Sequence, residues 1–192
     1  GLLDEIKEKA DIAGFVDRRV ASEAQGKFRG LGVSMYLEQC GQGAGGGVDV
    51  EFAADGSVVL YAAQQDNGQG HLTTLTQIFS DRLGYDAELI KISQGDSQRS
   101  PPGTTGGAKM ATVLGSSVSE AASLIAGDAK KMAADHLGVD EVDVEFVEGV
   151  FTTSGTNQTI SIEELVRLTA TEDGPHPLNR FNDYQASGAT YP

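Results

Sequence analysis

The chain has few of the residues that build disulfides or side-chain metal sites. Cys40 is its single cysteine, so no disulfide can form within the chain. The three histidines, His71, His136 and His176, lie far apart in the sequence. A Cys/His metal site needs several such ligands at short, characteristic spacings. The sequence therefore predicts no metal ion held by protein side chains.

Basic residues are also scarce, and no long hydrophobic run is present. The chain has 14 Lys and Arg against 28 Asp and Glu, a net charge of −14. A negative field repels nucleic-acid phosphates and anionic lipids, which argues against both as partners. No apolar run approaches the ~18 residues of a membrane span, and no signal peptide precedes the first charges. We expect a cytoplasmic protein, with a periplasmic location left open.

Glycine, in contrast, is abundant. The 25 glycines make up about 13% of the 192 residues, against a usual level of about 7%. Without a collagen-type period, this abundance indicates tight turns or places where the backbone approaches a ligand closely. The length and the 39% hydrophobic content suit one globular domain over residues 1–192. We expect this domain to be a segment of a longer subunit.

Hydrophobic periodicity predicts an α+β (mixed α/β) fold, with helices covering a mixed sheet that contains hairpins. Helices are expected at residues 2–12, 72–83, 113–137 and 161–168. Strands are expected at residues 29–37, 48–52, 58–62, 89–92, 142–146 and 150–151. Asp55-Gly56 and Glu148-Gly149 mark the turns of two hairpins. Residues 171–192 show no clear period and are expected to be an irregular tail.

Two glycine-rich segments each lie between a predicted strand and a predicted helix. They are Asp66-Asn67-Gly68-Gln69-Gly70-His71 and Thr104-Thr105-Gly106-Gly107-Ala108-Lys109-Met110. A helix N-terminus offers free N–H groups and the positive end of the helix dipole, and glycine lets a ligand approach. Together the two segments would form a cradle for a ligand with phosphate or oxo groups. The alternative is simple turn chemistry without a ligand.

Known nucleotide-binding motifs do not fit these segments. Neither contains the G-x-G-x-x-G pattern of dinucleotide-binding folds. The second segment approaches a P-loop, with Gly103 and Lys109 correctly spaced, but Ala108 replaces the required glycine and Met110 the Mg²⁺-binding Ser or Thr. A nucleoside triphosphatase is therefore disfavoured. His71, in the first helical turn, is more simply explained as structural than as catalytic.

Five stretches in one order and spacing resemble the large subunit of the molybdenum hydroxylases. This family includes xanthine dehydrogenase, aldehyde oxidase and carbon monoxide dehydrogenase. The similar stretches are Gly30–Glu38, Asp55–Val58, Gly68-Gln69-Gly70-His71-Leu72-Thr73, Gly95-Asp96-Ser97 and Thr105–Met110. Their similarity covers nearly the whole chain.

The resemblance implies that the chain contributes to a molybdopterin site. It places Gln69 within hydrogen-bonding distance of the molybdenum oxo group. It also places backbone groups of the two glycine-rich segments around the pterin and its phosphate. The implied cofactor-binding residues are Gly68, Gln69, Gly70, Thr73, Thr105, Gly106, Gly107, Ala108 and Lys109. The family holds its molybdenum through the pterin dithiolene, and its electrons leave through iron–sulfur clusters and FAD on partner subunits or domains.

Three departures from the family pattern limit what the chain is expected to do. Ala108, Lys109 and Met110 stand where the family has Ser, Arg and Ser, and lysine lacks the planar fork of arginine. The family's catalytic glutamate, in a G-E-x-G motif, has no counterpart in this sequence, and neither has its first cofactor-contacting lobe. We therefore expect no catalytic residue in this chain and no activity from it in isolation.

Three functions remain open. The first is a segment of an enzyme subunit that hydroxylates an aldehyde, a purine or a related substrate with oxygen derived from water. The second is a non-catalytic ligand-binding or assembly module that retains the fold. The third, a phosphate-binding regulatory domain, suits the acidic composition least.

Overall fold

The computed structural model describes residues 1–37, 40–41, 45–171 and 173–187. The chain forms two compact units, residues 1–37 and residues 38–192. The single domain expected over residues 1–192 stays a prediction, within which the chain divides into these two units. None of the described residues before residue 38 is buried.

The N-terminal unit contains two short helices, α1 (Leu2–Lys9) and α2 (Phe15–Glu23), neither with a buried residue. The helix expected near the N-terminus is confirmed in α1, whereas α2 was not predicted. The strand expected at residues 29–37 is wrong, because this exposed stretch forms no strand ladder. A β-strand needs a partner for its backbone hydrogen bonds, and alternating apolar residues do not supply one. Glu38 is the last residue of the stretch Gly30–Glu38 that resembles the molybdenum hydroxylases, and it lies outside the described residues.

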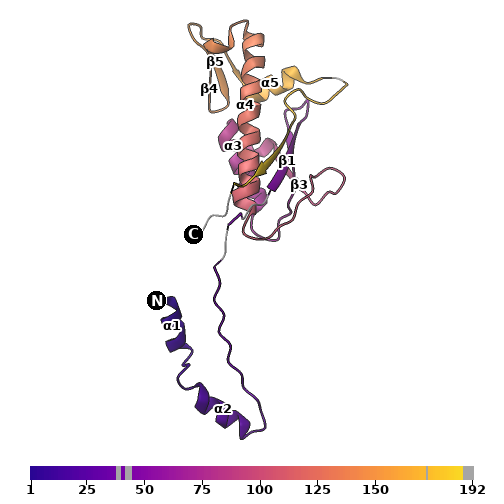
Figure 1. The fold of residues 1–192 in the computed structure, drawn as a ribbon. Coiled ribbons are helices and arrows are strands. Elements are labelled where there is room, and N and C mark those ends of the chain that lie inside the picture. The colour runs from indigo at the N-terminus through magenta and orange to yellow at the C-terminus, as the bar shows by residue number, and fades with distance from the viewer. Residues whose placement is uncertain (38–39, 42–44, 172, 188–192) are drawn as a thin grey trace. The chain divides into compact units, whose positions relative to one another are not determined.

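A four-stranded mixed sheet forms the centre of the second unit (Figure 1). Its order is β3-β2-β1-β7, from β1 (Gly45–Phe52), β2 (Val58–Ala62), β3 (Ile90–Gln94) and β7 (Arg180–Gln185). β1 pairs antiparallel with β2 and β7, whereas β2 pairs parallel with β3. The predicted Asp55-Gly56 hairpin is confirmed. Alternate residues of β1 and β2 are buried, as two-residue periodicity requires.

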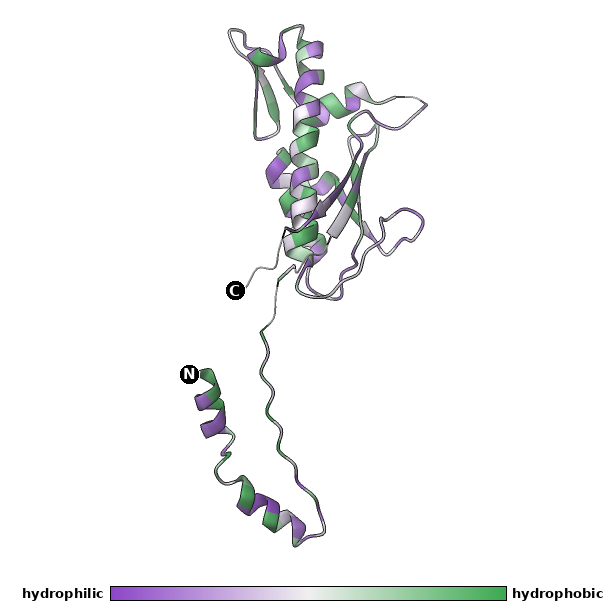
Figure 2. Cartoon of the chain, viewed as in Figure 1, coloured by the Kyte–Doolittle hydropathy of each residue, from purple (hydrophilic) through white to green (hydrophobic). Residues whose placement is uncertain are grey.

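Two helices pack against each other and against this sheet. α3 (His71–Leu83) buries a stripe of residues four apart, and α4 (Gly115–Leu137) is the long predicted helix. A π-helical turn at Met110–Leu114 leads into α4. Both helices end at a left-handed glycine, Gly84 and Gly138, where a residue without a side chain is favoured. Small buried residues on α4 allow the close packing, and Figure 2 shows its mixture of apolar and polar residues.

A second, antiparallel sheet lies beside α4 and α5 (Ile162–Thr169), in the order β4-β5-β6. Its strands are β4 (Val144–Val147), β5 (Val150–Thr153) and β6 (Thr159–Ser161). Short 3₁₀ turns at Ala87–Leu89 and Glu141–Asp143 precede β3 and β4. The Ser161 hydroxyl accepts the Glu164 N–H at 3.1 Å, so Ser161 is the N-cap of α5, and the last predicted helix is confirmed.

Strand β7 corrects the prediction of an irregular tail at residues 171–192. Its inward-facing positions are polar, so the sequence shows no apolar alternation. Asn182 Nδ2 donates to the Ser117 carbonyl (3.1 Å), and the Ser117 hydroxyl donates to the Asn182 carbonyl (3.0 Å). Arg180 forms an ion pair with Asp128 of α4. β7 is therefore attached to α4 by polar contacts between residues far apart in the sequence.

Candidate functional site

The candidate site is built by two loops at one edge of the four-stranded sheet. The β2–α3 loop (residues 63–70) and the β3–α4 loop (residues 95–109) follow neighbouring parallel strands. Parallel strands end at the same edge, so both loops leave the sheet together. The predicted proximity of Gly68–Gly70 and Thr105–Gly107 is confirmed, since residues of both loops line one cavity of about 280 Å³.

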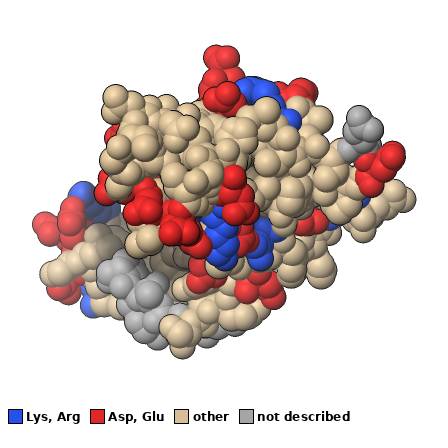
Figure 3. Space-filling model, turned by 90° about the horizontal axis from the view of Figure 1, so that it is seen from above, with Lys and Arg blue, Asp and Glu red and all other residues tan. Residues whose placement is uncertain are grey.

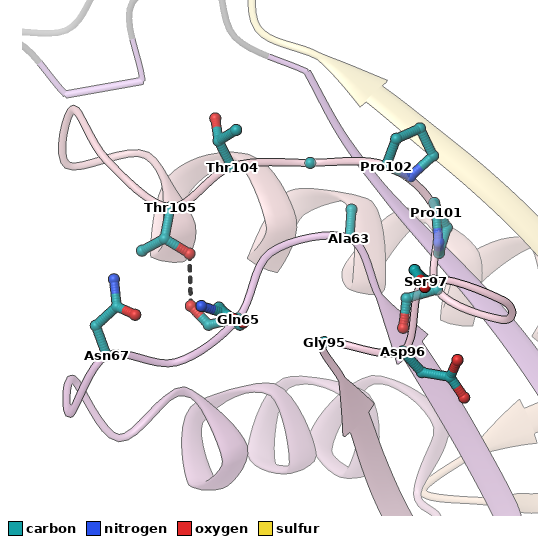
Figure 4. Close-up of a pocket in the computed structure, with 12 residues that line it drawn as sticks. Ala63, Gln65, Asn67, Gly95, Asp96, Ser97, Pro101, Pro102, Thr104 and Thr105 are labelled. Atoms are coloured by element: carbon teal, nitrogen blue, oxygen red, sulfur yellow. Dashed lines mark hydrogen bonds between the residues drawn. The ribbon is translucent and has the colours of Figure 1, made fainter.

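Hydrogen bonds join the two loops directly. The Thr105 hydroxyl donates to the Gln65 carbonyl, as the dashed line in Figure 4 shows. Gln94, the last residue of β3, donates from Nε2 to the Gln64 carbonyl (2.8 Å) and accepts the Asp66 N–H (3.2 Å). The β2–α3 loop is thus held by both β3 and the β3–α4 loop.

Asp66 organises the β2–α3 loop. Its Oδ1 accepts the N–H groups of Gly68 (2.9 Å) and Gln69 (2.7 Å), and its Oδ2 accepts that of His71 (3.1 Å). Desolvation opposes ionisation, but these N–H donors together hold the pKa of the Asp66 carboxyl below its ordinary value. The carboxylate therefore occupies donors that the sequence analysis assigned to a ligand at Gly68.

The β3–α4 loop keeps its donors. In the part of the chain that the structure describes, no hydrogen bond engages the backbone N–H groups of Gly106, Gly107 or Ala108. Lys109 lies beside them and donates from Nζ to the Thr104 hydroxyl (3.0 Å). Ala108 has a φ of 48°, a left-handed conformation unusual for a residue with a side chain. The anion-binding capacity of the site therefore belongs to the β3–α4 loop more than to the helix α3 terminus.

The nine residues implied as cofactor-binding do not all face the cavities. Gln69, Thr105, Gly106, Ala108 and Lys109 line the 280 Å³ cavity. Gly68, Gly70 and Gly107 adopt left-handed turns nearby. Thr73 is exposed on the first turn of α3 and lines neither this cavity nor its neighbour.

A larger cavity of about 550 Å³ adjoins the first and shares Asn67 and Thr105 with it (Figure 4). The β3–α4 loop supplies most of its lining, from Gly95-Asp96-Ser97 and from Ser100 to Thr105. Sequence analysis placed Asp66 and Asn67 in the first glycine-rich segment without giving either a role, and it missed Gln65. An aspartate two residues before a glycine is a turn-forming signal that would have indicated the role of Asp66.

The site suits an anionic organic cofactor better than a bare metal ion. Among the described residues, no three Asp, Glu, His or Cys side chains gather where they would hold a metal ion. The 280 Å³ cavity instead offers the Gln69 amide, the Lys109 ammonium and the free N–H groups of the β3–α4 loop. His71 adds a buried ring nitrogen that has no partner among the described residues. These are donors for phosphate and carbonyl oxygens, so the residues present fit a phosphate-bearing pterin.

The surface charge and the length of the helices are the features on which nucleic-acid and membrane partners would depend. Figure 3 shows acidic side chains spread over one face of the molecule, with fewer basic ones among them. None of the helices in the described ranges has the length and apolar character needed to cross a lipid bilayer.

Comparison with protein families matches residues 5–191 to the molybdopterin cofactor-binding domain. The nicotine 6-hydroxylase large subunit of Paenarthrobacter nicotinovorans is 30% identical over 178 residues, covering 85% of this chain and 22% of that subunit. The carbon monoxide dehydrogenase large chain of Hydrogenophaga pseudoflava is 32% identical over 127 residues, covering 66% of this chain and 16% of that one.

Among solved structures, the reconstituted CO dehydrogenase from Oligotropha carboxidovorans has a TM-score of 0.74 to this chain at 26% identity. That match covers 97% of this chain and 26% of the other, and it supports the predicted α+β fold. The chain thus spans 16% to 26% of the length of these three relatives.

Proposed function

This chain belongs to the molybdopterin cofactor-binding domain family, and on that premise we propose that it forms one wall of a cofactor site. The parent protein would be the large subunit of a molybdenum hydroxylase, an oxidoreductase. The observation that carries the proposal is the cavity lined by both glycine loops, which the Thr105–Gln65 hydrogen bond joins.

Each loop has a separate task in this proposal. The N–H groups of Gly106, Gly107 and Ala108, with the Lys109 ammonium, hold anionic oxygens of the cofactor. Gln69 presents its amide toward the metal end of the cofactor. Asp66 holds Gln69 in place through its backbone, and the Thr105–Gln65 bond sets the separation of the two loops. Gly68, Gly70, Gly107 and Thr73 act by shaping the turns and the first turn of α3.

When bound, the cofactor supplies the molybdenum centre at which a substrate carbon is oxidised with oxygen derived from water. The residues of this chain bind and orient the cofactor, and none of them is proposed as a general base. We further propose that iron–sulfur and FAD subunits or domains accept the electrons, and that the rest of the subunit closes the site. A small molecule such as an aldehyde or a purine is the proposed substrate, as in aldehyde oxidase and xanthine dehydrogenase. We also propose that the parent protein is located in the cytoplasm.

Cofactor content of the full-length protein, produced with its partner subunits, tests the proposal. Purified wild-type protein should contain molybdenum and pterin in near-stoichiometric amounts. Lys109→Gln should lower both, because it removes the ammonium group of a residue that lines the cavity. Lys109→Arg should retain them. Lys91→Gln, on the exposed face of β3, is the matched control and should change neither.

A wild-type protein that holds no molybdenum or pterin would contradict the proposal. That result, with the fold intact, would favour the non-catalytic ligand-binding or assembly module. Cofactor content unaffected by Lys109→Gln would leave the family assignment intact but remove Lys109 from the site.

A further inference from the structure

His71 lines the 280 Å³ cavity, and one of its ring nitrogens has no partner among the described residues. His71 is 7% exposed, and its Nε2 forms no hydrogen bond with any described residue. His71 lines this cavity together with Gln69 and Lys109. Buried polar groups in folded proteins nearly always have partners, because an unpartnered one retains the full cost of its desolvation. The nitrogen therefore calls for a partner that the described residues do not supply.

Packing alone does not explain a histidine at this position. His71 begins the buried stripe of α3, followed at four-residue intervals by Leu75, Phe79 and Leu83. An apolar side chain would fill the same place in the stripe without leaving a polar atom unpaired. The other three members of the stripe are apolar. Only the member that reaches the cavity is polar.

The other buried histidine shows how this fold treats a structural imidazole. His176 is 6% exposed and uses both ring nitrogens. Its Nδ1 accepts the Leu178 N–H (3.1 Å), and its Nε2 donates to the Val166 carbonyl (3.0 Å). Burial lowers the pKa of this ring, and the accepting Nδ1 is that of a neutral imidazole. His71 differs from His176 because its Nε2 has no partner among the described residues, as expected of a side chain that binds a ligand.

The position of His71 is well defined. Its backbone N–H donates to Asp66 Oδ2 at 3.1 Å, and Gly70 before it adopts a left-handed conformation that begins the helix. The cavity wall around it carries donors: the Gln69 amide, the Lys109 ammonium and the unengaged N–H groups of the β3–α4 loop. A ligand that suits this wall presents oxygen atoms. An imidazole Nε2–H suits the same chemistry.

We propose that His71 is a further cofactor-binding residue, whose Nε2–H donates a hydrogen bond to an oxygen of the molybdopterin held between the two loops. This inference rests on the proposed function and adds a contact from the buried face of α3. It makes α3 a contributor through a side chain, whereas Asp66 already engages the backbone N–H groups of Gly68, Gln69 and His71.

Two substitutions separate binding from packing in the full-length protein with its partner subunits. His71→Leu keeps an apolar side chain of similar size and removes the donor. His71→Gln retains a donor at similar reach. His136→Leu, at an exposed position of α4, is the control. Each protein is prepared with cofactor, and also from a host that does not make it.

The first readout is pterin and molybdenum retained after dialysis, and the second is the thermal midpoint of the cofactor-free protein. His71→Leu should retain cofactor about tenfold less well, as expected for one lost hydrogen bond. Its cofactor-free midpoint should equal or exceed that of wild type, because an unpaired buried atom is removed. His71→Gln should restore most of the retention. His136→Leu should change neither quantity.

Equal cofactor retention by wild type and His71→Leu would overturn the inference while leaving the proposed function standing. A lower cofactor-free midpoint for both His71 variants, with loss of cofactor in both, would also overturn it, because that pattern marks a packing residue. A wild-type protein without molybdopterin would overturn the proposed function and this inference together.

Discussion

The Thr105 hydroxyl donates a hydrogen bond to the backbone carbonyl of Gln65, 40 positions earlier in the chain. The bond connects the β2–α3 loop with the β3–α4 loop, which also approach each other where Gly103 lies against Ala63. Thr105 lines both neighbouring cavities, so it stands on the boundary between them. We infer that this contact sets the separation of the loops and with it the width of the site.

Thr105→Val should loosen the two loops with little loss of overall stability. The Gln65 residue is exposed, so water can replace the lost donor, and we expect a decrease of about 0.5–1.5 kcal/mol in the free energy of unfolding. Cofactor retention in the full-length protein should fall more clearly. Thr152→Val, at an exposed position of β5, is the matched control. Retention equal to that of wild type would show that the bond does not set the width of the site.

Gln69→Ala should reduce turnover in the full-length enzyme by roughly 10²–10³-fold, the usual effect of losing one preorganised hydrogen bond near developing charge. The thermal midpoint should change little, because Gln69 is exposed. Turnover per bound molybdenum is the quantity to measure. Gln98→Ala, an exposed glutamine of the β3–α4 loop, serves as the control. A metal-loaded Gln69→Ala protein with normal turnover would refute the role of Gln69.

Asp66→Asn should change the dependence of stability on pH. The folded state lowers the pKa of the Asp66 carboxyl below the ordinary 3.8, so the folded protein binds fewer protons than the unfolded chain near that pH. The stabilisation is therefore complete above pH 3.8 and is lost as the pH falls through the lower folded-state pKa. Thermal midpoints measured from about pH 6 downward should fall less steeply for Asp66→Asn than for wild type. Asp81→Asn, exposed on α3, should follow the wild-type curve.

Gly84→Ala should destabilise the fold more than a left-handed backbone alone explains. Gly84 has a φ of 63°, and an added Cβ would overlap the backbone of Glu148 and Gly149 in the β4–β5 turn. Gly138→Ala is a matched control, with a φ of 69° but open space around the added atom. The control should lose only the left-handed penalty of about 1–2 kcal/mol. If denaturant unfolding gives the same loss in free energy of unfolding for both variants, the β4–β5 turn can move away from the added Cβ at little cost.

Much of the fold was predictable because its signals are local. The Asp55-Gly56 turn, the glycines that end α3 and α4, and the Ser161 N-cap each act within a few residues. Such signals depend on backbone conformation and on short-range hydrogen bonds, so a sequence displays them directly. The two glycine loops were likewise visible as interruptions between a strand and a helix. Their resemblance to a known family identified the cofactor.

The parts that sequence analysis missed or misassigned depend on partners distant in the chain. The apolar alternation at residues 29–37 predicts a strand, but pairing requires a neighbouring strand, and this stretch has none within the described residues. β7 has no apolar alternation and is nevertheless a strand, because its backbone pairs with β1 and its polar side chains bond to α4.

In the candidate site too, some features follow from the sequence and others only from the tertiary structure. The sequence by itself determined which residue types are present: glycines for close approach, one lysine, one amide and a histidine at a helix start. Only the tertiary structure decided that Asp66 engages the N–H groups of Gly68 and Gln69, while those of the β3–α4 loop stay available within the described residues. It also decided that His71 is buried without a partner among those residues while His176 is fully bonded. Whether a polar group is satisfied depends on every atom within about 3 Å of it, and residues remote in sequence supply most of those atoms.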